Sequence, residues 1–137
     1  MTRDAAELHR GLFGAIVARD YDDLRALFAS DAVHVSGEGD ATIGPESVVE
    51  EVQGFVTAFP DLSIDIEHQH VVGPSRSIVE YTFRGTHDGP LDDVATTGEV
   101  IPVRACSVVE AHDGFIRRES DYYNTLDMLT QLGASAR

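Results

Sequence analysis

The sequence predicts an α+β fold in which a strongly curved antiparallel sheet encloses N-terminal helices. Two observations carry this prediction. Hydrophobic residues in the first third recur at helical spacing, whereas those in the second half alternate with polar residues as in β-strands. Helices followed by consecutive antiparallel strands are the order typical of α+β proteins. At 137 residues, 42% of them hydrophobic, the chain is expected to form one domain, residues 1–137, around one core.

Three helices are predicted before Pro60, which ends the third. Asp4 followed by Glu7 is typical of a helix N-terminus, and Pro45 stands at the favoured first position of the third helix. A final helix is expected to stop at Gly133. The hydrophobic residues expected on the inner faces of the first three helices are Leu8, Leu12, Ile16, Leu24, Leu27, Phe28, Val48, Val52, Phe55 and Phe59.

The second half predicts four strands, and a short strand around Val33 precedes them. Asp113-Gly114 is a hairpin signal between the last two. The four ranges are 64–72, 78–86, 100–111 and 115–123. Alternation in the first of them is expected to place on one face Ile64, Ile66, His68, His70 and Val72. Curving such a sheet around helices leaves a central, mostly apolar pocket that suits a small molecule.

Charge and cysteine content exclude several classes of protein. The chain carries 24 acidic and 10 basic residues, for a net charge of −14, and all the basic residues are Arg. A surface this acidic repels nucleic acid and anionic membranes, so neither is an expected partner. The single Cys106 cannot form an internal disulfide. The chain also lacks a hydrophobic run typical of a signal peptide or membrane span, so we expect a cytoplasmic protein.

Three segments of the chain resemble the SnoaL-like polyketide cyclase family, which has the nuclear-transport-factor-2-like fold. They are Phe59-Pro60-Asp61-Leu62, then Arg84-Gly85-Thr86-His87-Asp88-Gly89 with Thr97-Gly98, and finally Asp113-Gly114-Phe115-Ile116 continuing through Asp121-Tyr122-Tyr123-Asn124 to Gln131-Leu132-Gly133. The resemblance implies a cone-shaped sheet wrapped around the N-terminal helices, a small-molecule ligand and a homodimer. It also implies chemistry that needs neither metal nor cofactor.

The resemblance also implies a reaction. In the family's cyclases, a carboxylate near the end of the last strand is the acid–base of an aldol-type ring closure, and a His on the preceding strand assists. Here Asn124 stands at the position of that carboxylate, and Asn cannot exchange a proton at neutral pH. Asp121, three residues earlier, is therefore the predicted base. Cyclisation or isomerisation of an oxygenated, largely apolar molecule is the expected activity.

The other candidate site residues have structural alternatives. His87 is predicted as the acid or carbonyl anchor, but it can instead order the loop that follows it. Asn124 can orient a ligand, cap the final helix, or both. Tyr81 is a predicted orienting group. The remaining candidates for substrate contact are His70, Arg104 and Phe59.

Three further hypotheses remain open. The chain can be a non-catalytic binding protein of the same fold, which the Asn124 departure favours. It can be an epoxide-hydrolase-like enzyme, if Glu119 and Asp121 converge beside Arg104 and activate a water molecule. Finally, His68 and His70 point to one side of a strand and can form a three-His metal site with His87, although no metal is expected.

Overall fold

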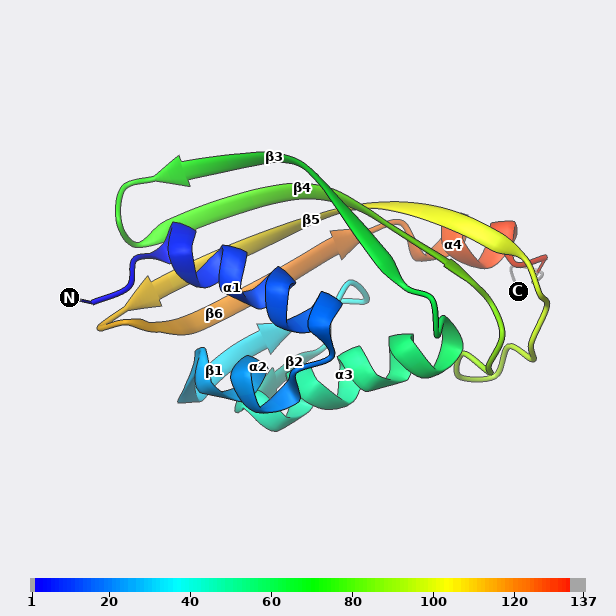
Figure 1. Cartoon of the computed structure of the whole chain (residues 1–137), viewed down its shortest axis with the longest axis horizontal. Helices are drawn as coiled ribbons and strands as arrows, with labels where there is room; N and C mark the ends of the chain where they lie inside the picture. Colours follow the sequence, from blue (N-terminus) through cyan, green and yellow to red (C-terminus); the bar gives the residue numbers. More distant parts are fainter. Residues whose placement is uncertain (1, 134–137) are drawn as a thin grey trace.

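A computed structural model describes residues 2–133 and confirms the α+β fold. The sheet has six strands in the order β2-β1-β6-β5-β4-β3, and it curves without closing (Figure 1). Three helices lie along its inner side, and the fourth lies near the far end of β6. The helices are α1 (Ala5–Ala18), α2 (Tyr21–Ala26), α3 (Pro45–Ala58) and α4 (Thr125–Gln131). The strands are β1 (Phe28–Val35), β2 (Ala41–Ile43), β3 (Ser63–Val72), β4 (Arg76–Thr86), β5 (Val100–His112) and β6 (Phe115–Tyr123).

The helix boundaries follow local sequence chemistry. The Asp4 side chain accepts a hydrogen bond from the Glu7 backbone N–H at 2.9 Å, which satisfies one of the free donors at the start of α1. Pro45 opens α3 as predicted. One detail of the prediction is wrong, because Phe28 opens β1 instead of continuing the second helix.

The sheet departs from the prediction in one pairing. Strands β3 to β6 form consecutive antiparallel pairs, but β1 runs parallel to β6. The early strand therefore lies beside the last one, and the register places His34 opposite Glu119. Because directly paired residues point to the same face of a sheet, this pairing brings two polar side chains together inside the fold.

A β-bulge in β3 corrects the predicted strand face. Ile66 pairs with Tyr81, but the next pair is His68 with Glu80, so Glu67 is an extra residue in the ladder. One extra residue moves every later side chain to the opposite face. His68 and His70 therefore lie on the outer face of the sheet, away from Ile66.

The core lies between the helices and the inner face of the sheet. The buried residues form two clusters, one around α1, α2 and β1, and the other around the end of α3 and strands β4 and β5. Gly89 lets the loop after β4 contact the end of α3, because a Cβ atom there would overlap the Thr57 carbonyl oxygen. Within residues 2–133, no helix is long and apolar enough to span a membrane.

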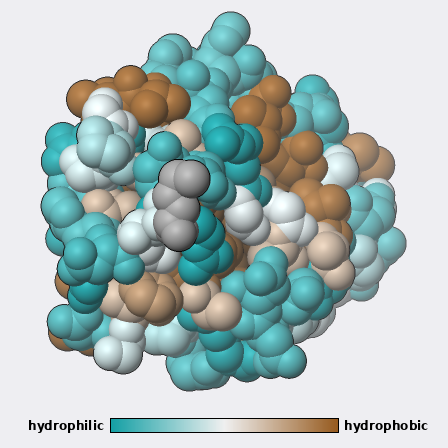
Figure 2. Space-filling model, turned by 60° about the vertical axis from the view of Figure 1, so that its left-hand side comes forward, coloured by the Kyte–Doolittle hydropathy of each residue, from teal (hydrophilic) through white to brown (hydrophobic). Residues whose placement is uncertain are grey.

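The end of the molecule that carries the N-terminus is mixed in character. Exposed hydrophobic side chains occur there at the end of β3 (Val71 and Val72) and at the start of β6 (Phe115). Figure 2 shows brown hydrophobic patches on this side that are interrupted by teal hydrophilic residues. This face therefore presents scattered apolar residues and not one continuous apolar surface.

Candidate active site

A cavity lies between α1, α3 and the inner face of the sheet. Its empty volume is about 660 Å³, including the part that opens to solvent. Most of its wall is hydrophobic or aromatic, which suits a largely apolar molecule. The lining residues are Leu12, Phe13, Ile16, His34, Val48, Glu51, Val52, Phe55, Leu62, Ile64, Tyr81, Phe83, Glu119, Asp121 and Tyr123.

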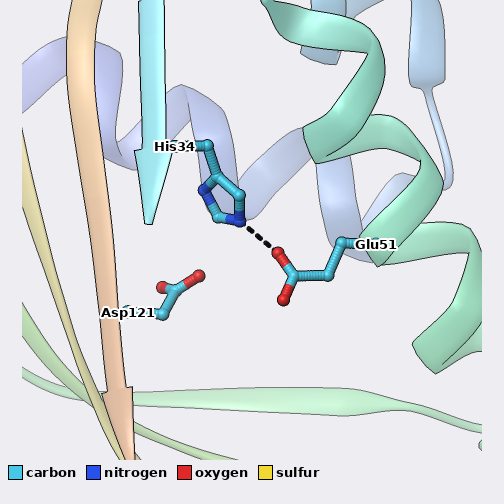
Figure 3. Close-up of side chains that lie close together, drawn as sticks. All are labelled: His34, Glu51 and Asp121. Atoms are coloured by element: carbon cyan, nitrogen blue, oxygen red, sulfur yellow. Dashed lines mark hydrogen bonds and ion pairs between the residues drawn. The ribbon is translucent and has the colours of Figure 1, made fainter. Parts of the chain in front are cut away.

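One histidine and three acidic side chains interrupt this apolar wall. His34 comes from β1, Glu51 from α3, and Glu119 and Asp121 from β6. Figure 3 shows that His34, Glu51 and Asp121 point toward one another, with the imidazole bonded through Nε2 to the Glu51 carboxylate. Three elements that are distant in sequence thus place one imidazole and three carboxyl groups in a mostly apolar cavity.

Glu119 has a partner for each of its carboxylate oxygens. The Ser107 hydroxyl donates a hydrogen bond to Oε2 at 2.7 Å. The other oxygen, Oε1, lies 2.9 Å from Nδ1 of His34. Among residues 2–133 that nitrogen has no partner in hydrogen-bond geometry, so the contact is an ion pair without hydrogen-bond alignment. Glu119 is 3% exposed, and a buried carboxylate needs such partners to remain ionised.

The electrostatics make His34 a cation and Glu119 an anion at neutral pH. Burial opposes the charge on the His34 ring, but contacts with Glu119 and Glu51 outweigh it and raise its pKa to about 9. Burial also opposes the charge on Glu119. The contacts of Glu119 with His34, Asp121 and Ser107 outweigh that cost and lower its pKa.

The pKa of Asp121 shifts in the opposite direction to that of Glu119. Burial and the neighbouring negative charge of Glu119 raise its pKa well above the ordinary value. Glu119 has both a hydroxyl donor and a cationic partner, whereas Asp121 gains no comparable stabilisation of its charged form. A proton shared by this pair is therefore favoured on Asp121 over Glu119.

The raised pKa of His34 predicts that stability falls as pH rises. A group whose pKa is higher in the folded state stabilises the fold below its unfolded pKa, here 6.5, and loses that effect as pH rises through 9. The free energy of unfolding should decrease by about 3 kcal/mol over this interval, because one pKa unit corresponds to about 1.4 kcal/mol. Urea denaturation at several pH values measures the change. The variant His34→Gln should give a flatter profile, and an equally steep one would contradict the assignment.

Aromatic rings complete the polar end of the cavity. Tyr81 and Tyr123 both line it, and burial raises the pKa of each phenol, so both hydroxyl groups stay protonated at neutral pH. Tyr81 packs edge-on against Phe13, with ring centroids 4.8 Å apart. Tyr123 makes similar edge-on contacts with Phe55 at 6.2 Å and Phe83 at 6.0 Å. These rings offer a flat apolar surface to a ligand beside the carboxyl groups.

Comparisons with known proteins identify the family of this chain. The sequence pattern of the SnoaL-like polyketide cyclase family matches residues 7–132. The chain belongs to this family. A search of curated proteins found no match.

Several solved structures share the fold. A candidate SnoaL-like polyketide cyclase from Jannaschia sp. CCS1 superposes with a TM-score of 0.87 at 21% identity, covering 96% of this chain and 93% of that one. IdmH, a candidate polyketide cyclase from Streptomyces antibioticus, superposes with a TM-score of 0.80 at 26% identity, covering 95% of this chain and 99% of IdmH. AclR, a candidate hydroxylase from Streptomyces galilaeus, superposes with a TM-score of 0.82 at 23% identity, covering 94% of this chain and 80% of AclR.

Two of the residues predicted for a SnoaL-like site line the cavity, and two others are buried without lining it. Asp121 and Tyr81 are lining residues. Phe59 and His87 are not, although both are buried and their rings lie 5.5 Å apart. His87 Nδ1 lies 2.9 Å from the Thr97 hydroxyl, so this side chain ties down the loop after β4. That arrangement matches the structural alternative for His87.

His70 and Arg104 lie on the outer face of the sheet. Nε2 of His70 is 2.6 Å from Oε2 of Glu80, and the His70 side chain is 53% exposed. Arg104 pairs with Thr82 in the ladder, one position away from the inward-facing Val103. The structure therefore does not bring these two residues to the cavity, nor does it place Arg104 beside Glu119 and Asp121.

Asn124 caps α4. Its side-chain oxygen accepts a hydrogen bond from the Asp127 backbone N–H at 2.9 Å, and it does not line the cavity. We expect Asn124→Asp to leave activity unchanged, because Asp caps helices equally well. We expect Asn124→Ala to lower the free energy of unfolding by about 1 kcal/mol. Urea denaturation and an activity assay measure the two results, and a large activity change with Asp would contradict the capping role.

Sequence analysis missed His34 and Glu51. The alternation of His34 with Val33 and Val35 predicts only a short strand, yet His34 is 4% exposed. Its partner Glu119 is reached only through the parallel pairing of β1 and β6. Glu51 carried a usable signal, because its spacing from Val48 and Phe55 places it on the apolar face of α3.

The structure offers a different set of potential metal ligands from the three histidines considered above. His34, Glu51 and Asp121 present donor atoms within 4.8 Å of one another. A divalent cation accepts this donor set, but it would compete with the bond between His34 and Glu51. His68 and His70 lie on the outer face, and His87 lies in the buried loop contact, so these three are not brought together.

Proposed function

We propose that this SnoaL-like chain is a cofactor-independent enzyme that cyclises or isomerises a small oxygenated, largely apolar molecule. One observation carries the proposal, which is the placement of Asp121 in an apolar cavity beside the Glu119 anion. A carboxyl group with a raised pKa keeps its proton at neutral pH and can donate it to a carbonyl oxygen. The family supports a small-molecule ligand.

In the proposed mechanism, Asp121 acts first as acid and then as base. Its protonated carboxyl group donates to the substrate carbonyl oxygen that becomes negative as the carbon–carbon bond forms. The resulting carboxylate then accepts the proton that the enol oxygen of the same substrate releases. In an isomerisation, the same carboxyl group delivers a proton to oxygen and removes one from carbon. Both sequences return Asp121 to its starting state.

The surrounding residues orient the substrate and control charge. The Tyr81 hydroxyl is protonated and lines the cavity, so it can donate to a second substrate oxygen. The His34 cation neutralises part of the negative charge of Glu51 and Glu119, which keeps Asp121 able to ionise during the reaction. The aromatic wall holds the flat part of the substrate.

Proton exchange at carbon tests this function without knowledge of the natural substrate. 2-Tetralone is a flat, apolar ketone whose α-protons exchange with deuterium in D₂O, and ¹H NMR measures the rate. We expect the rate to rise in proportion to protein concentration and to saturate with ketone. The variant Arg84→Gln, which alters an exposed ion pair on the outer face, should behave like the wild type. Binding of 2-tetralone without faster exchange would instead support the non-catalytic binding protein.

A second candidate, an epoxide-hydrolase-like enzyme, has one supporting observation. Two carboxyl groups, Glu119 and Asp121, do converge in the cavity, as that reaction requires for activating a water molecule. The cation beside them is His34 and not Arg104. Hydrolysis of styrene oxide, followed by chromatography of the diol, separates this activity from proton exchange.

The homodimer remains a proposal. The outer face carries a hollow that includes His70, Glu80, Arg104 and the 60%-exposed Tyr122, and a second copy of this chain can cover it. Size-exclusion chromatography with light scattering gives the mass of the protein in solution. The variant Tyr122→Glu should shift a dimer toward monomer. A monomeric wild type at micromolar concentration would contradict the proposal.

A further inference from the structure

A chain of hydrogen bonds, buried except at its last residue, leads from the cavity to β3. It starts at Glu119, passes through Ser107, His9 and Ser77, and ends at Gln69. The successive distances are 2.7 Å for Ser107 to Glu119, 2.9 Å for His9 to Ser107, 2.8 Å for His9 to Ser77 and 3.1 Å for Gln69 to Ser77. Only Glu119 among these residues lines the cavity. Ser107 has been described above as a hydrogen-bond donor to Glu119, but the site gives no role to His9, Ser77 or Gln69.

The direction of every bond in this chain follows from the number of hydrogens available. Ser107 has one hydroxyl hydrogen and gives it to the carboxylate of Glu119, so its oxygen accepts from His9 Nε2. His9 therefore carries its proton on Nε2, and Nδ1 accepts from the Ser77 hydroxyl. The Ser77 oxygen in turn accepts from the amide of Gln69. All donors point toward Glu119.

This direction requires a neutral His9, and the surroundings keep it neutral. The ring is 0% exposed and stacks on Phe13, with ring centroids 5.5 Å apart. Burial outweighs the attraction of Glu119 and lowers the pKa of His9 to about 4. Ser77 and Ser107 are also buried. Apolar residues would fill these positions at lower desolvation cost, so polar groups here need a reason beyond packing.

We propose that His9, Ser77 and Ser107 form a positioning relay that holds Glu119 as an ionised acceptor and thereby keeps the transferable proton on Asp121. The relay residues do not touch the substrate. Their value for the reaction rests on the proposed function, because that function needs a protonated Asp121. Their effect on the two carboxyl groups does not depend on any reaction.

Several other titratable groups face this carboxyl pair and act in parallel with the relay. His34 and Glu51 approach from β1 and α3, and Tyr81 and Tyr123 approach from β4 and β6. None of them changes in variants of Ser107 or Ser77, so those variants isolate the relay. Loss of the Ser107 hydroxyl removes a stabilising bond from the charged form of Glu119 only.

NMR titration of the intact protein tests the relay directly. ¹⁵N shifts should show His9 protonated on Nε2, and ¹³C carboxyl shifts follow Glu119 and Asp121. In Ser107→Ala, the lower of the two apparent pKa values of the carboxyl pair should rise by about one unit, a typical effect of one lost bond to a charged group. A proton on Nδ1 of His9, or an unchanged titration in Ser107→Ala, would overturn the proposal.

The remote end of the chain distinguishes a relay from a single local bond. Ser77→Ala leaves Glu119 and Ser107 intact but removes the donor that fixes the His9 tautomer. We expect a mixed His9 tautomer and a smaller upward change in the same apparent pKa. The exposed Ser63→Ala on β3 is the matched control and should have no effect. An unchanged titration in Ser77→Ala would show that only the bond from Ser107 to Glu119 affects the carboxyl pair, and it would refute the relay.

Two variants of His9 test the relay independently, and one of them retains a hydrogen-bond donor so that an effect on the relay can be separated from an effect on folding. His9→Gln retains an amide donor toward Ser107 and should rescue most of the titration behaviour, whereas His9→Leu should not. Both are compared in folded protein, as judged by their amide spectra. If the relay is right and the proposed function is wrong, the titrations change but 2-tetralone exchange stays at the buffer rate in every variant. If wild-type exchange is fast and the titrations do not change, the relay alone fails.

Discussion

Asp121→Asn is expected to lower the protein-catalysed exchange of 2-tetralone α-protons by about 10²- to 10⁴-fold, the typical contribution of a positioned acid–base group. Asn has the size of Asp and retains a donor toward Glu119, but it cannot release and recover a proton. Because burial and the Glu119 charge favour the protonated form of Asp121, the substitution imitates the neutral form of this side chain. The loss should therefore appear in kcat and not in stability.

Two measurements make this result specific. The thermal unfolding midpoint of Asp121→Asn should equal or exceed that of the wild type, and 2-tetralone should still perturb the NMR signals of residues that line the cavity. Tyr122→Phe, next to Asp121 but 60% exposed on the outer face, is the matched control and should retain full exchange activity. Exchange within threefold of the wild type in Asp121→Asn would exclude Asp121 as the proton-transfer group.

His34→Leu is expected to lower the free energy of unfolding by about 3–5 kcal/mol, the usual cost of removing one partner from a buried ion pair. The imidazolium stands between Glu51 and the 3%-exposed Glu119. Leucine fills similar space but removes the cationic partner of Glu119, which keeps only its contacts with Ser107 and Asp121. Urea denaturation at pH 7 measures the loss.

Two variants calibrate the result for His34. His34→Gln keeps an amide donor near Glu51 and should lose less stability than His34→Leu. Arg76→Leu removes one member of the Arg76–Glu110 pair, in which the Arg76 side chain is 51% exposed, and should cost below about 1 kcal/mol. A similarly small loss in His34→Leu would show that Glu119 does not depend on the imidazolium for its charge.

Features governed by neighbouring residues could be predicted from the sequence. The start of α1 follows from Asp4 and Glu7, and the start of α3 follows from Pro45. The last strand was predicted at residues 115–123, and β6 has the same bounds. Alternation along β6 also indicated that Glu119 and Asp121 share a face, because successive side chains in a strand point to opposite sides.

Features governed by distant residues could not be predicted. A single extra residue, Glu67, turns His68 and His70 outward, and no local signal marks it as a bulge. The charge state of Asp121 depends on Glu119, His34 and burial together, none of which alternation reveals. The inward position of His34 depends on a parallel pairing with a strand near the other end of the chain. Long-range pairing is therefore the main information that the sequence pattern lacks.

The parallel pairing of β1 with β6 also constrains how the molecule is made. A ribosome releases β1 early, but the strand that completes its hydrogen bonds emerges only after β3, β4 and β5. Until then His34 cannot pair with Glu119, and His9 cannot bond to Ser107, which lies 98 residues away along the chain. Contacts of this separation slow folding. The helices and the strand that are synthesised first therefore cannot complete their packing, and their apolar faces stay exposed through most of synthesis. A chaperone would matter most during this interval.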